Sequence, residues 1–407
     1  MRHTLPPGLP PGMTEAARLT RAGKLAEATS LIQRLLRGEG KAEPPPDTTT
    51  PGATLEGEFV RLDPAPSAAD ADPRPARKPG ADATPRAGLG ETLRGLAARF
   101  KPSGLHGGAR RPAPDPLPDG ASFATLSHSG VGGTRAYKLY VPANPGDGPR
   151  PLVVMLHGCT QSPDDFAAGT RMNAFAERHG ILVAYPEQPA SANAQRCWNW
   201  FKPDDQRRDQ GEPALIAGIT RRIMHDHRVD PERVYIAGLS AGGAAAAIMA
   251  AAYPDLYAAV GVHSGLPAGA AHDLPSALAA MRQGGGHGRR SAERGARAVP
   301  TIVFHGDRDS VVHPRNGDDV TAQATAAKAG LRSELKQGQA PGGHAYSRSV
   351  HRDPEGRALC EQWTIHGAGH AWAGGSPAGS YTDPQGPDAT AEMLRFFLEQ
   401  RRGATPG

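Results

Sequence analysis

The sequence predicts an α/β fold, with a doubly wound, mostly parallel sheet and helices on both of its faces. Short and nearly continuous apolar runs recur from about residue 121 onward, and each ends in Gly, His, Asp or another polar residue. Such runs are typical of parallel strands that are buried on both faces. Helical patterns separate the runs, so strand and helix alternate along the chain. In sheets of this kind, ligands bind at the carboxyl ends of the strands.

Six apolar runs are the expected core strands. They are residues 151–158 (PLVVMLHG), 180–187 (GILVAYPE), 233–240 (RVYIAGLS), 258–265 (AAVGVHSG), 300–307 (PTIVFHGD) and 361–367 (EQWTIHG). The expected helices include residues 213–228 and 388–402. Residues 135–142 (RAYKLYVP) alternate apolar and polar side chains, which predicts an antiparallel edge strand. Together these elements predict a main domain over residues 121–402.

The first 120 of the 407 residues differ from the rest in composition. Apolar side chains at helical spacing over residues 13–38 predict a helical hairpin within residues 1–40, which resembles a single tetratricopeptide-type helix pair. One such pair cannot bury its own apolar face, so we expect it to dock on the main domain, a second copy or a partner. A weakly helical tail is the alternative. Residues 41–120 contain 15 prolines and few large apolar side chains, which predicts a disordered linker.

Charge and hydropathy argue against several classes of function. The net charge is +5, and the densest basic cluster, at residues 289–297, lies in a glycine-rich stretch without interleaved aromatic residues. We therefore expect no nucleic-acid partner. No run of about 18 apolar residues is present, so no membrane span is expected. The first residues, MRHTLPPGLPPGM, lack the apolar core of a secretory signal, which favours a cytoplasmic or non-classically exported protein.

Residues 238–242 have the motif Gly-Leu-Ser-Ala-Gly, directly after an expected strand and directly before an alanine-rich segment. This context is typical of a sharp strand-to-helix turn that presents a nucleophilic serine, here Ser240. The flanking glycines let backbone segments approach without a Cβ clash, and the alanines let the following helix pack closely. For the motif alone, an ordinary strand-to-helix turn is the alternative.

A serine hydroxyl is a poor nucleophile unless a base accepts its proton, and a third group must orient that base. The expected acid is Asp309, in the pattern His-Gly-x-x-Asp-x-x-Val on the loop after the strand at 300–307. Asp307, two residues nearer the strand, is the second choice. Both carboxylates are expected at the same edge of the sheet as Ser240.

The expected base is His370, on a glycine-rich loop past the strand at 361–367. His366 still lies within that strand, so we expect it to pack or to make a structural hydrogen bond. The order Ser240, Asp309, His370 along the chain matches the arrangement of α/β-hydrolases. The sequence therefore predicts a serine hydrolase, and no cofactor or metal is expected for this chemistry.

The reaction also needs hydrogen-bond donors for the negative charge that develops on the substrate oxygen. One expected donor is the backbone N–H of Ala241, the residue after the nucleophile. The second is expected from residues 156–160 (LHGCT), the loop after the first core strand, with Cys159 as the donor. His157 is expected to set the turn of this loop beside the substrate, and a simple loop histidine is the alternative.

Aromatic residues on neighbouring loops suggest the walls of a substrate pocket. Trp198 and Trp200 belong to the segment CWNWF, which follows the second core strand. They suggest an apolar wall for an acyl chain, although Trp198 could instead be a packed loop anchor. Trp372, two residues after His370, is expected at the rim of the pocket.

The three cysteines match no metal-binding spacing. Cys159 and Cys197 both lie on loops at the same end of the expected sheet. A disulfide between them would tie the loop that carries the expected anion donor to the aromatic loop, and the sequence leaves open whether that bond forms. Cys360 begins an expected strand, and we expect it to be a buried thiol.

The main domain resembles the catalytic domain of the poly(3-hydroxybutyrate) depolymerase family of esterases, whose relatives include feruloyl and acetylxylan esterases. The matching stretches are LVVMLHGCTQSPDDFAAGTRMNAFAERHGILVAYPEQ, CWNWF, RVYIAGLSAGG, VGVHSGLP, IVFHGDRDSVVHPRNG and WTIHGAGHAWAGG. They follow one another in order within residues 121–402. The resemblance implies an α/β-hydrolase fold with Ser240 as nucleophile, Asp309 as acid and His370 as base. It also implies hydrolysis of short-chain hydroxyalkanoate esters or polyesters.

The chain departs from a typical secreted depolymerase of that family. We find no separate β-rich substrate-binding domain, and a hairpin and linker are expected in front, which argues against action on insoluble crystalline polymer. Family relatives include extracellular enzymes. One alternative function is a feruloyl or acetylxylan-type carbohydrate esterase. Another is a protein-interaction module in which residues 13–38 bind a partner and the hydrolase domain is a scaffold. A complete triad argues against the scaffold.

Overall fold

A computed structural model describes most of the main domain. The described residues are 116–144, 146, 148–285, 299–326 and 328–403. The expected hairpin at residues 13–38, nearly all of the expected linker and the basic cluster at 289–297 lie outside them, so these expectations stay predictions. In the part of the chain that is described, no helix is long and apolar enough to cross a membrane.

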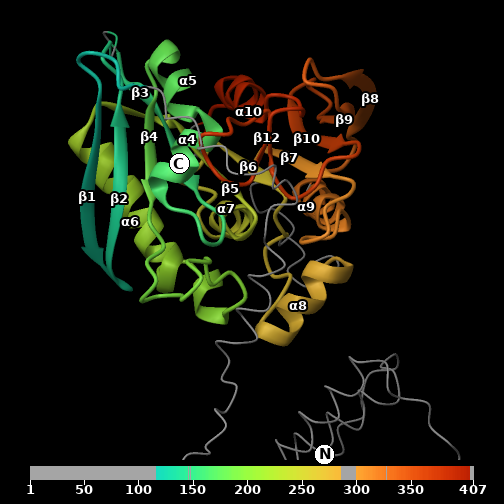
Figure 1. Ribbon diagram of the computed structural model, residues 1–407, viewed down its shortest axis with the longest axis horizontal. Coiled ribbons are helices and arrows are strands. Elements are labelled where there is room, and N and C mark those ends of the chain that lie inside the picture. The colour runs from blue at the N-terminus through green and yellow to red at the C-terminus, as the bar shows by residue number, and fades with distance from the viewer. Residues whose placement is uncertain (1–115, 145, 147, 286–298, 327, 404–407) are drawn as a thin grey trace, which may run out of the picture. The chain divides into compact units, whose positions relative to one another are not determined.

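A ten-stranded sheet runs through the described residues in the order β1-β2-β4-β3-β5-β6-β7-β10-β9-β8 (Figure 1). Its centre, from β4 to β10, is parallel, and antiparallel strands flank it on both sides. The strands are β1 (Ser122–Gly130), β2 (Gly133–Val141), β3 (Arg150–Leu156), β4 (Leu182–Pro186), β5 (Val229–Leu239), β6 (Ala259–His263), β7 (Thr301–Gly306), β8 (Arg332–Gln339), β9 (Ala345–Arg352) and β10 (Ala358–Ile365). A second, two-stranded sheet consists of β11 (Trp372–Ala373) and β12 (Thr382–Asp383).

The parallel centre confirms the predicted fold class. The six expected core strands are β3, β4, β5, β6, β7 and β10. Residues 135–141 lie in β2, which is antiparallel, as predicted, and pairs with β4. The prediction that this segment is an edge strand is wrong, because β1 pairs with the other side of β2. The strands β1, β8 and β9 were not predicted, and β8 (RSELKQGQ) is almost entirely exposed, so it has no apolar pattern to reveal it.

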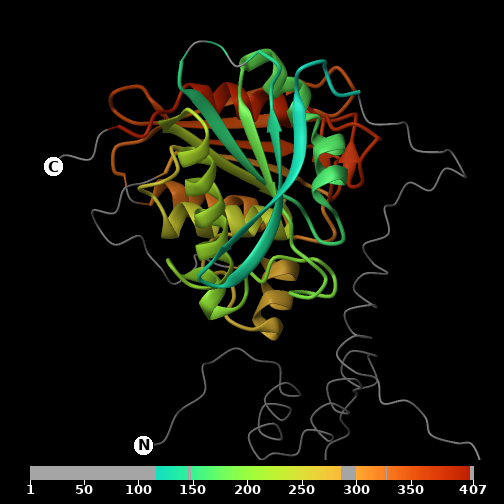
Figure 2. The same cartoon turned by 90° about the vertical axis from the view of Figure 1, so that its left-hand side faces the viewer.

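Helices cover both faces of the sheet, which Figure 2 views from the β1 edge. The helices are α4 (Pro163–Thr170), α5 (Met172–His179), α6 (Gly211–Asp226), α7 (Ala241–Ala252), α8 (Leu274–Gln283), α9 (Arg315–Thr325) and α10 (Ala389–Leu398), with a short 3-10 helix, η1, at Pro203–Gln206. Successive side chains of β3 point to opposite faces. Leu152 and Val154 pack in a core with α6, α7, α8 and α9, whereas Val153 and Met155 pack in a second core with α4, α5 and α10. The predicted helices at 213–228 and 388–402 correspond to α6 and α10.

Polar side chains fix where three of the helices begin. At α4, the hydroxyl of Ser162 accepts a hydrogen bond from the N–H of Asp165. At α8, Asp273 accepts one from the N–H of Ser276 in a capping box, and at α10 Asp388 caps the first turn in the same way. These caps satisfy N–H groups that a helix start leaves without a partner. They therefore also fix the ends of the loops that connect sheet and helices.

Candidate active site

Ser240 lies at the sharp turn between β5 and α7. Its backbone has φ 58° and ψ −120°, a conformation that a non-glycine residue keeps only where the surrounding structure enforces it. A Cβ atom on Gly238 would lie 2.3 Å from the backbone of Gly242, and one on Gly242 would lie 2.1 Å from the carbonyl oxygen of Leu156. Both glycines of the motif are therefore needed for close approach of the backbone around Ser240.

The alanines that follow Ser240 allow α7 to lie close to the sheet. Residues 244–247 are all buried, and α7 packs against β5, β6 and β3. Larger side chains at these positions would push α7 away from the strands, because a packed core has no room for added methylenes without backbone shifts. The N-terminus of α7 carries Ser240, so the alanine run helps to fix the position of the serine.

Asp309, on the loop after β7, and His370, on the loop after β10, form a buried pair. The distance from Nδ1 of His370 to Oδ2 of Asp309 is 2.7 Å, and Oδ1 accepts the N–H groups of Val311 and Val312 at 2.9 Å each. Burial by itself raises the pKa of Asp309. The charge of His370 and hydrogen bonds from His305 and His370 outweigh this effect and hold the pKa well below its usual range. Asp309 is therefore an ionised carboxylate that orients the ring of His370.

Asp307 pairs with a different histidine. Its Oδ2 lies 2.9 Å from Nδ1 of His366, and its Oδ1 accepts the N–H of Gly367 at 2.7 Å. His366 therefore hydrogen-bonds to a carboxylate other than the one that contacts His370. Of the two candidate carboxylates, Asp309 is the one that contacts His370.

Ser240 and His370 both line one small pocket. Its volume, with the open mouth included, is about 210 Å³. The remaining lining residues are Gly158, Cys159, Leu239 and Tyr381. Among the described residues, no direct hydrogen bond joins Ser240 to His370; such bonds are often long before substrate binds. The same part of the chain contains no group of three or more His, Cys, Asp or Glu side chains that could hold a metal ion.

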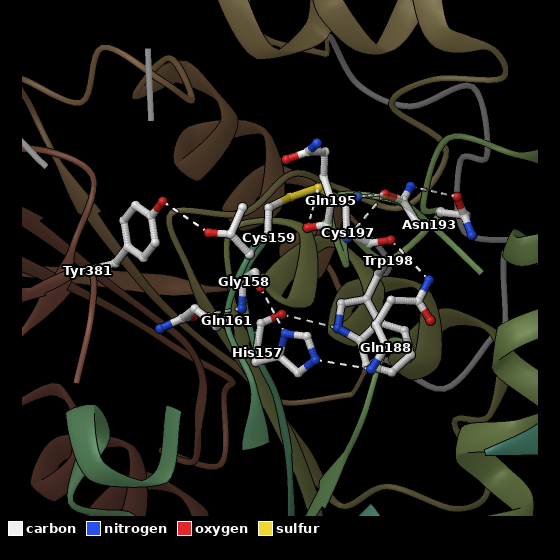
Figure 3. The surroundings of a disulfide bond; sticks show 12 residues. His157, Gly158, Cys159, Gln161, Gln188, Asn193, Gln195, Cys197, Trp198 and Tyr381 are labelled. Atoms are coloured by element: carbon white, nitrogen blue, oxygen red, sulfur yellow. Dashed lines mark hydrogen bonds between the residues drawn. A yellow bond between two sulfur atoms is a disulfide. The ribbon is translucent and has the colours of Figure 1, made fainter. Parts of the chain in front are cut away.

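A disulfide joins Cys159 to Cys197 across a sequence separation of 38 residues, which settles the pairing that the sequence left open (Figure 3). The bond ties the loop after β3 to the aromatic loop that begins at Cys197. A backbone hydrogen bond of 2.7 Å from the N–H of Thr160 to the carbonyl of Gln195 joins the same two loops. Cys360 is a buried free thiol, as predicted.

Of the two expected anion donors, one lines the pocket and the other directly follows Ser240. Cys159 lines the pocket, and Ala241 is the first residue of α7, where backbone N–H groups have no partner within the helix. Within the described residues, no hydrogen bond uses the backbone N–H of either one. The neighbouring N–H of Gly158, in contrast, donates to Oε1 of Gln161 at 2.9 Å.

The four residues expected to contact the substrate lie in the interior. His157, Trp198, Trp200 and Trp372 are all buried, and none of them lines the pocket. Nε1 of Trp198 donates to the carbonyl oxygen of His157 at 3.1 Å, so Trp198 acts as a loop anchor (Figure 3). Nε1 of Trp372 donates to the hydroxyl of Thr390 at 3.0 Å. Burial lowers the pKa of His157 to about 4, so its ring is neutral.

A buried polar network holds the aromatic loop in place. The carboxylate of Glu212 accepts hydrogen bonds from the backbone and side-chain N–H groups of Asn199 and from the amide of Gln188. The oxygen of the same Gln188 amide accepts a hydrogen bond from the buried guanidinium of Arg135. Burial, followed by the negative charge of Asp205, raises the pKa of Glu212 to about 7, although the hydrogen bonds oppose this rise. The charge of Glu212 therefore changes near neutral pH.

Tyr381 lines the pocket although the sequence did not single it out. It lies between β11 and β12 with a left-handed φ of 53°, and its hydroxyl is 3.2 Å from the hydroxyl of Thr160 (Figure 3). This contact joins the loop after β3 to the loop that follows His370. A single tyrosine in a loop matches no motif, so only the fold could bring it to the site.

Two buried histidines lie near Asp309 and were also missed. Nε2 of His305 donates to a backbone carbonyl oxygen at 2.8 Å and lies 3.4 Å from Oδ2 of Asp309. Nε2 of His263 accepts the N–H of Ala373 at 3.0 Å, close to His370 along the chain. Burial lowers the pKa of His263 to about 3, so its ring is neutral and free to accept. Their one sequence signal is that each lies at or near the carboxyl end of an expected strand.

Comparison with known proteins places these features among esterases. The family model described as "Esterase PHB depolymerase" matches residues 135–332. Poly(3-hydroxyalkanoate) depolymerase C of Paucimonas lemoignei is 34% identical over 241 residues, which cover 56% of this chain and 56% of that protein. Feruloyl esterase B of Thermothelomyces thermophilus is 31% identical, over 46% of this chain and 67% of that protein. The chain thus spans little more than half the length of the depolymerase.

A solved structure shows the same fold. The acetyl xylan esterase from Aspergillus awamori superposes with a TM-score of 0.55 and 19% sequence identity. The match covers 68% of this chain and 99% of that protein. The described domain therefore has the α/β-hydrolase fold.

Proposed function

The chain belongs to the family of PHB depolymerase esterases, and from this premise we propose that it is a serine esterase acting on short-chain hydroxyalkanoate esters or polyesters. The observation that carries the proposal is the pocket that Ser240 and His370 share. Asp309, 2.7 Å from the far nitrogen of His370, supplies the orienting carboxylate. These are the residue types that an activated serine requires, and their order along the chain is that of α/β-hydrolases.

In the proposed reaction, Nε2 of His370 takes the hydroxyl proton of Ser240 while the serine oxygen attacks the ester carbonyl carbon. The bond from that carbon to the alcohol oxygen breaks, and His370 returns the proton to the leaving alcohol. Water, activated by the same histidine, then hydrolyses the acyl–Ser240 ester. The ionised Asp309 keeps Nδ1 of His370 protonated and stabilises the imidazolium that forms.

The backbone N–H groups of Cys159 and Ala241 are the proposed donors to the oxyanion. Their support is position, because Cys159 lines the pocket and Ala241 directly follows the nucleophile. One such donor is worth about 3 kcal/mol of barrier. The disulfide and the contact between Thr160 and Tyr381 hold the loop that carries Cys159.

The pocket is small, and its lining favours a short acyl group. Its volume, with the open mouth included, is about 210 Å³. Leu239 and Tyr381 give it apolar wall area, which suits a short aliphatic chain. The second candidate is an acetyl-specific carbohydrate esterase, because an acetyl group also fits and relatives named acetylxylan esterase match the chain. A feruloyl group is larger than either of these acyl groups, so a small pocket should accommodate it less well.

The test is to compare kcat/KM for 4-nitrophenyl butyrate, 3-hydroxybutyrate oligomers, acetylated xylan and methyl ferulate. We expect the butyrate and hydroxybutyrate esters to be hydrolysed best and the ferulate worst. The Ser240→Ala variant should lose turnover and keep its fold by circular dichroism. Activity above about a tenth of wild type in Ser240→Ala would remove the nucleophile assignment. A preference for acetylated xylan would select the second candidate.

A further inference from the structure

A second serine–histidine–aspartate chain of hydrogen bonds lies outside the pocket. The hydroxyl of Ser347 is 2.8 Å from Nε2 of His366, and Nδ1 of His366 is 2.9 Å from Oδ2 of Asp307. The other oxygen of Asp307 is held by the N–H of Gly367 at 2.7 Å. Ser347 belongs to β9, His366 directly follows β10, and Asp307 directly follows β7. A hydroxyl in hydrogen-bond contact with a base that a third group orients is the arrangement of an activated nucleophile.

The charge of Asp307 fixes which nitrogen of His366 carries a proton. Burial raises the pKa of Asp307, but the hydrogen bonds from His366 and Gly367 outweigh it, so that the pKa lies below its usual value. An ionised carboxylate can only accept, so Nδ1 of His366 carries the proton. In the neutral ring, Nε2 is then the acceptor, and the hydroxyl of Ser347 donates to it. This is the polarity that a general base needs.

The second chain of hydrogen bonds is open to solvent. The side chains of His366 and Asp307 are 40% and 38% exposed, whereas those of His370 and Asp309 are 7% and 0% exposed. Ser347 is partly buried. A small reagent can therefore reach this serine without entering the pocket.

The backbone around Ser347 differs from that around Ser240. Ser347 lies within β9 and is paired on one side with Gln337 of β8 and on the other with Thr364 of β10. It has no sharp turn and no helix start beside it, so it lacks the free N–H groups that such a turn offers to an oxyanion. Attack by this serine is consequently slow, and the acyl product is hydrolysed slowly as well.

We propose that Ser347 is a second activated serine of this chain and accepts an acyl group from small activated esters in a stoichiometric reaction. The bond from Oγ of Ser347 to the acyl carbon forms while the bond from that carbon to the leaving alcohol breaks. The hydroxyl proton passes to Nε2 of His366 and from there to the alcohol. The products are O-acyl-Ser347 and the free alcohol, with no change of oxidation state.

The test uses the full-length chain with Ser240→Ala, so that the reaction in the pocket does not compete. This protein is incubated with 4-nitrophenyl acetate, and acetylation is followed by intact mass and assigned by peptide mapping. The internal control is Ser349, two residues further along β9 and therefore on the same face of the sheet. We expect a single acetyl group on Ser347, gained at least about tenfold faster than on Ser349, since a general base contributes roughly 10²–10⁴-fold.

Further variants separate activation from simple exposure. Added to Ser240→Ala, Ser347→Ala should abolish this acetylation and Ser349→Ala should leave it unchanged. His366→Gln should slow it by about 100-fold, and Asp307→Asn tests the same relay if His366→Gln does not fold. Equal acetylation of Ser347 and Ser349 would overturn the proposal. An unchanged rate of Ser347 acetylation in folded His366→Gln and Asp307→Asn variants would also overturn it. The hydrogen bonds would then have only a structural role.

Discussion

Nδ1 of His370 lies 2.7 Å from Oδ2 of Asp309, although 61 residues separate them in the sequence. The same two loops form a second pair, because Asp307 and His366 meet at 2.9 Å. Burial distinguishes the two pairs: the first is almost fully enclosed, and the second is open to solvent. The low dielectric around the first pair strengthens its electrostatic interaction. We assign the proposed catalytic role to Asp309 because its partner, His370, lines the pocket together with Ser240.

Replacing the two carboxylates separately tests this assignment. Asp309→Asn should lower ester turnover by about 10⁴-fold, because an amide favours the wrong tautomer of His370. Asp307→Asn is the matched control and should lower turnover less than about tenfold, since Asp307 contacts His366 instead. Steady-state kinetics on 4-nitrophenyl butyrate, with circular dichroism to verify folding, measure both effects. A larger loss in Asp307→Asn would show that the acid is misassigned.

Removing the disulfide should weaken both the fold and the site. The bond closes a loop between Cys159 and Cys197, and the double variant Cys159→Ser/Cys197→Ser should lose about 3 kcal/mol of unfolding free energy. Turnover should fall as well, because the proposed oxyanion donor lies on the released loop. Urea unfolding and kinetics measure the two effects. Dithiothreitol should reproduce them in the wild type and change nothing further in the double variant. Equal stability of variant and wild type would contradict the prediction.

Glu212 should make stability depend on pH. Its pKa is about 7 in the folded protein and near 4.3 when unfolded. Between these values the folded state binds more protons, so stability is highest below about pH 4.3 and falls as pH rises to about 7. The unfolding free energy of wild type relative to Glu212→Gln should therefore fall by about 3 kcal/mol from pH 4.5 to pH 8. Parallel urea titrations of the two proteins measure this difference, and a constant difference would argue against the shift.

Truncation tests the expectation for the first 120 residues. A flexible chain of about 80 residues has a root-mean-square span of about 50 Å, and proline content lengthens it. A protein that starts near Ala121 should keep its turnover on soluble esters and lose self-association or partner binding through residues 13–38. Kinetics and sedimentation of full-length and truncated protein decide the matter. A large fall in turnover would assign the N-terminal segment to the catalytic fold, and unchanged association would leave residues 13–38 without the expected role.

The sequence was sufficient to predict the parallel centre of the sheet because each of its strands is a continuous apolar run. It was insufficient to predict β1, β8 and β9, which lie toward the two edges of the sheet. Edge strands can expose polar side chains on both faces, as β8 does, and an exposed polar run has no distinctive period. The order of the strands in the sheet could not be predicted either. The sequence pattern of β2 is the same whether or not another strand, here β1, pairs with its outer edge.

The candidate site shows the same division. Ser240, Asp309 and His370 could be predicted because each follows the carboxyl end of a parallel strand. In a parallel sheet these ends lie on the same side, so such positions come close together. No such rule predicts the direction in which a large side chain on a loop points. Trp198 and Trp372 were therefore expected at the substrate, and both turn inward to hydrogen-bond partners that the sequence does not reveal. Tyr381 reaches the pocket from a loop with no motif at all.

The disulfide also makes a covalent ring of the chain from Cys159 to Cys197. This ring contains α4, α5 and β4, a strand that pairs with β2 on one side and β3 on the other. A protease cut anywhere inside the ring would leave two polypeptides joined by one sulfur bridge. On a denaturing gel, such a nicked protein would migrate as a single band without reductant and as two bands with reductant. The segment between Cys159 and Cys197 can therefore lose backbone continuity without letting the two parts of the chain separate.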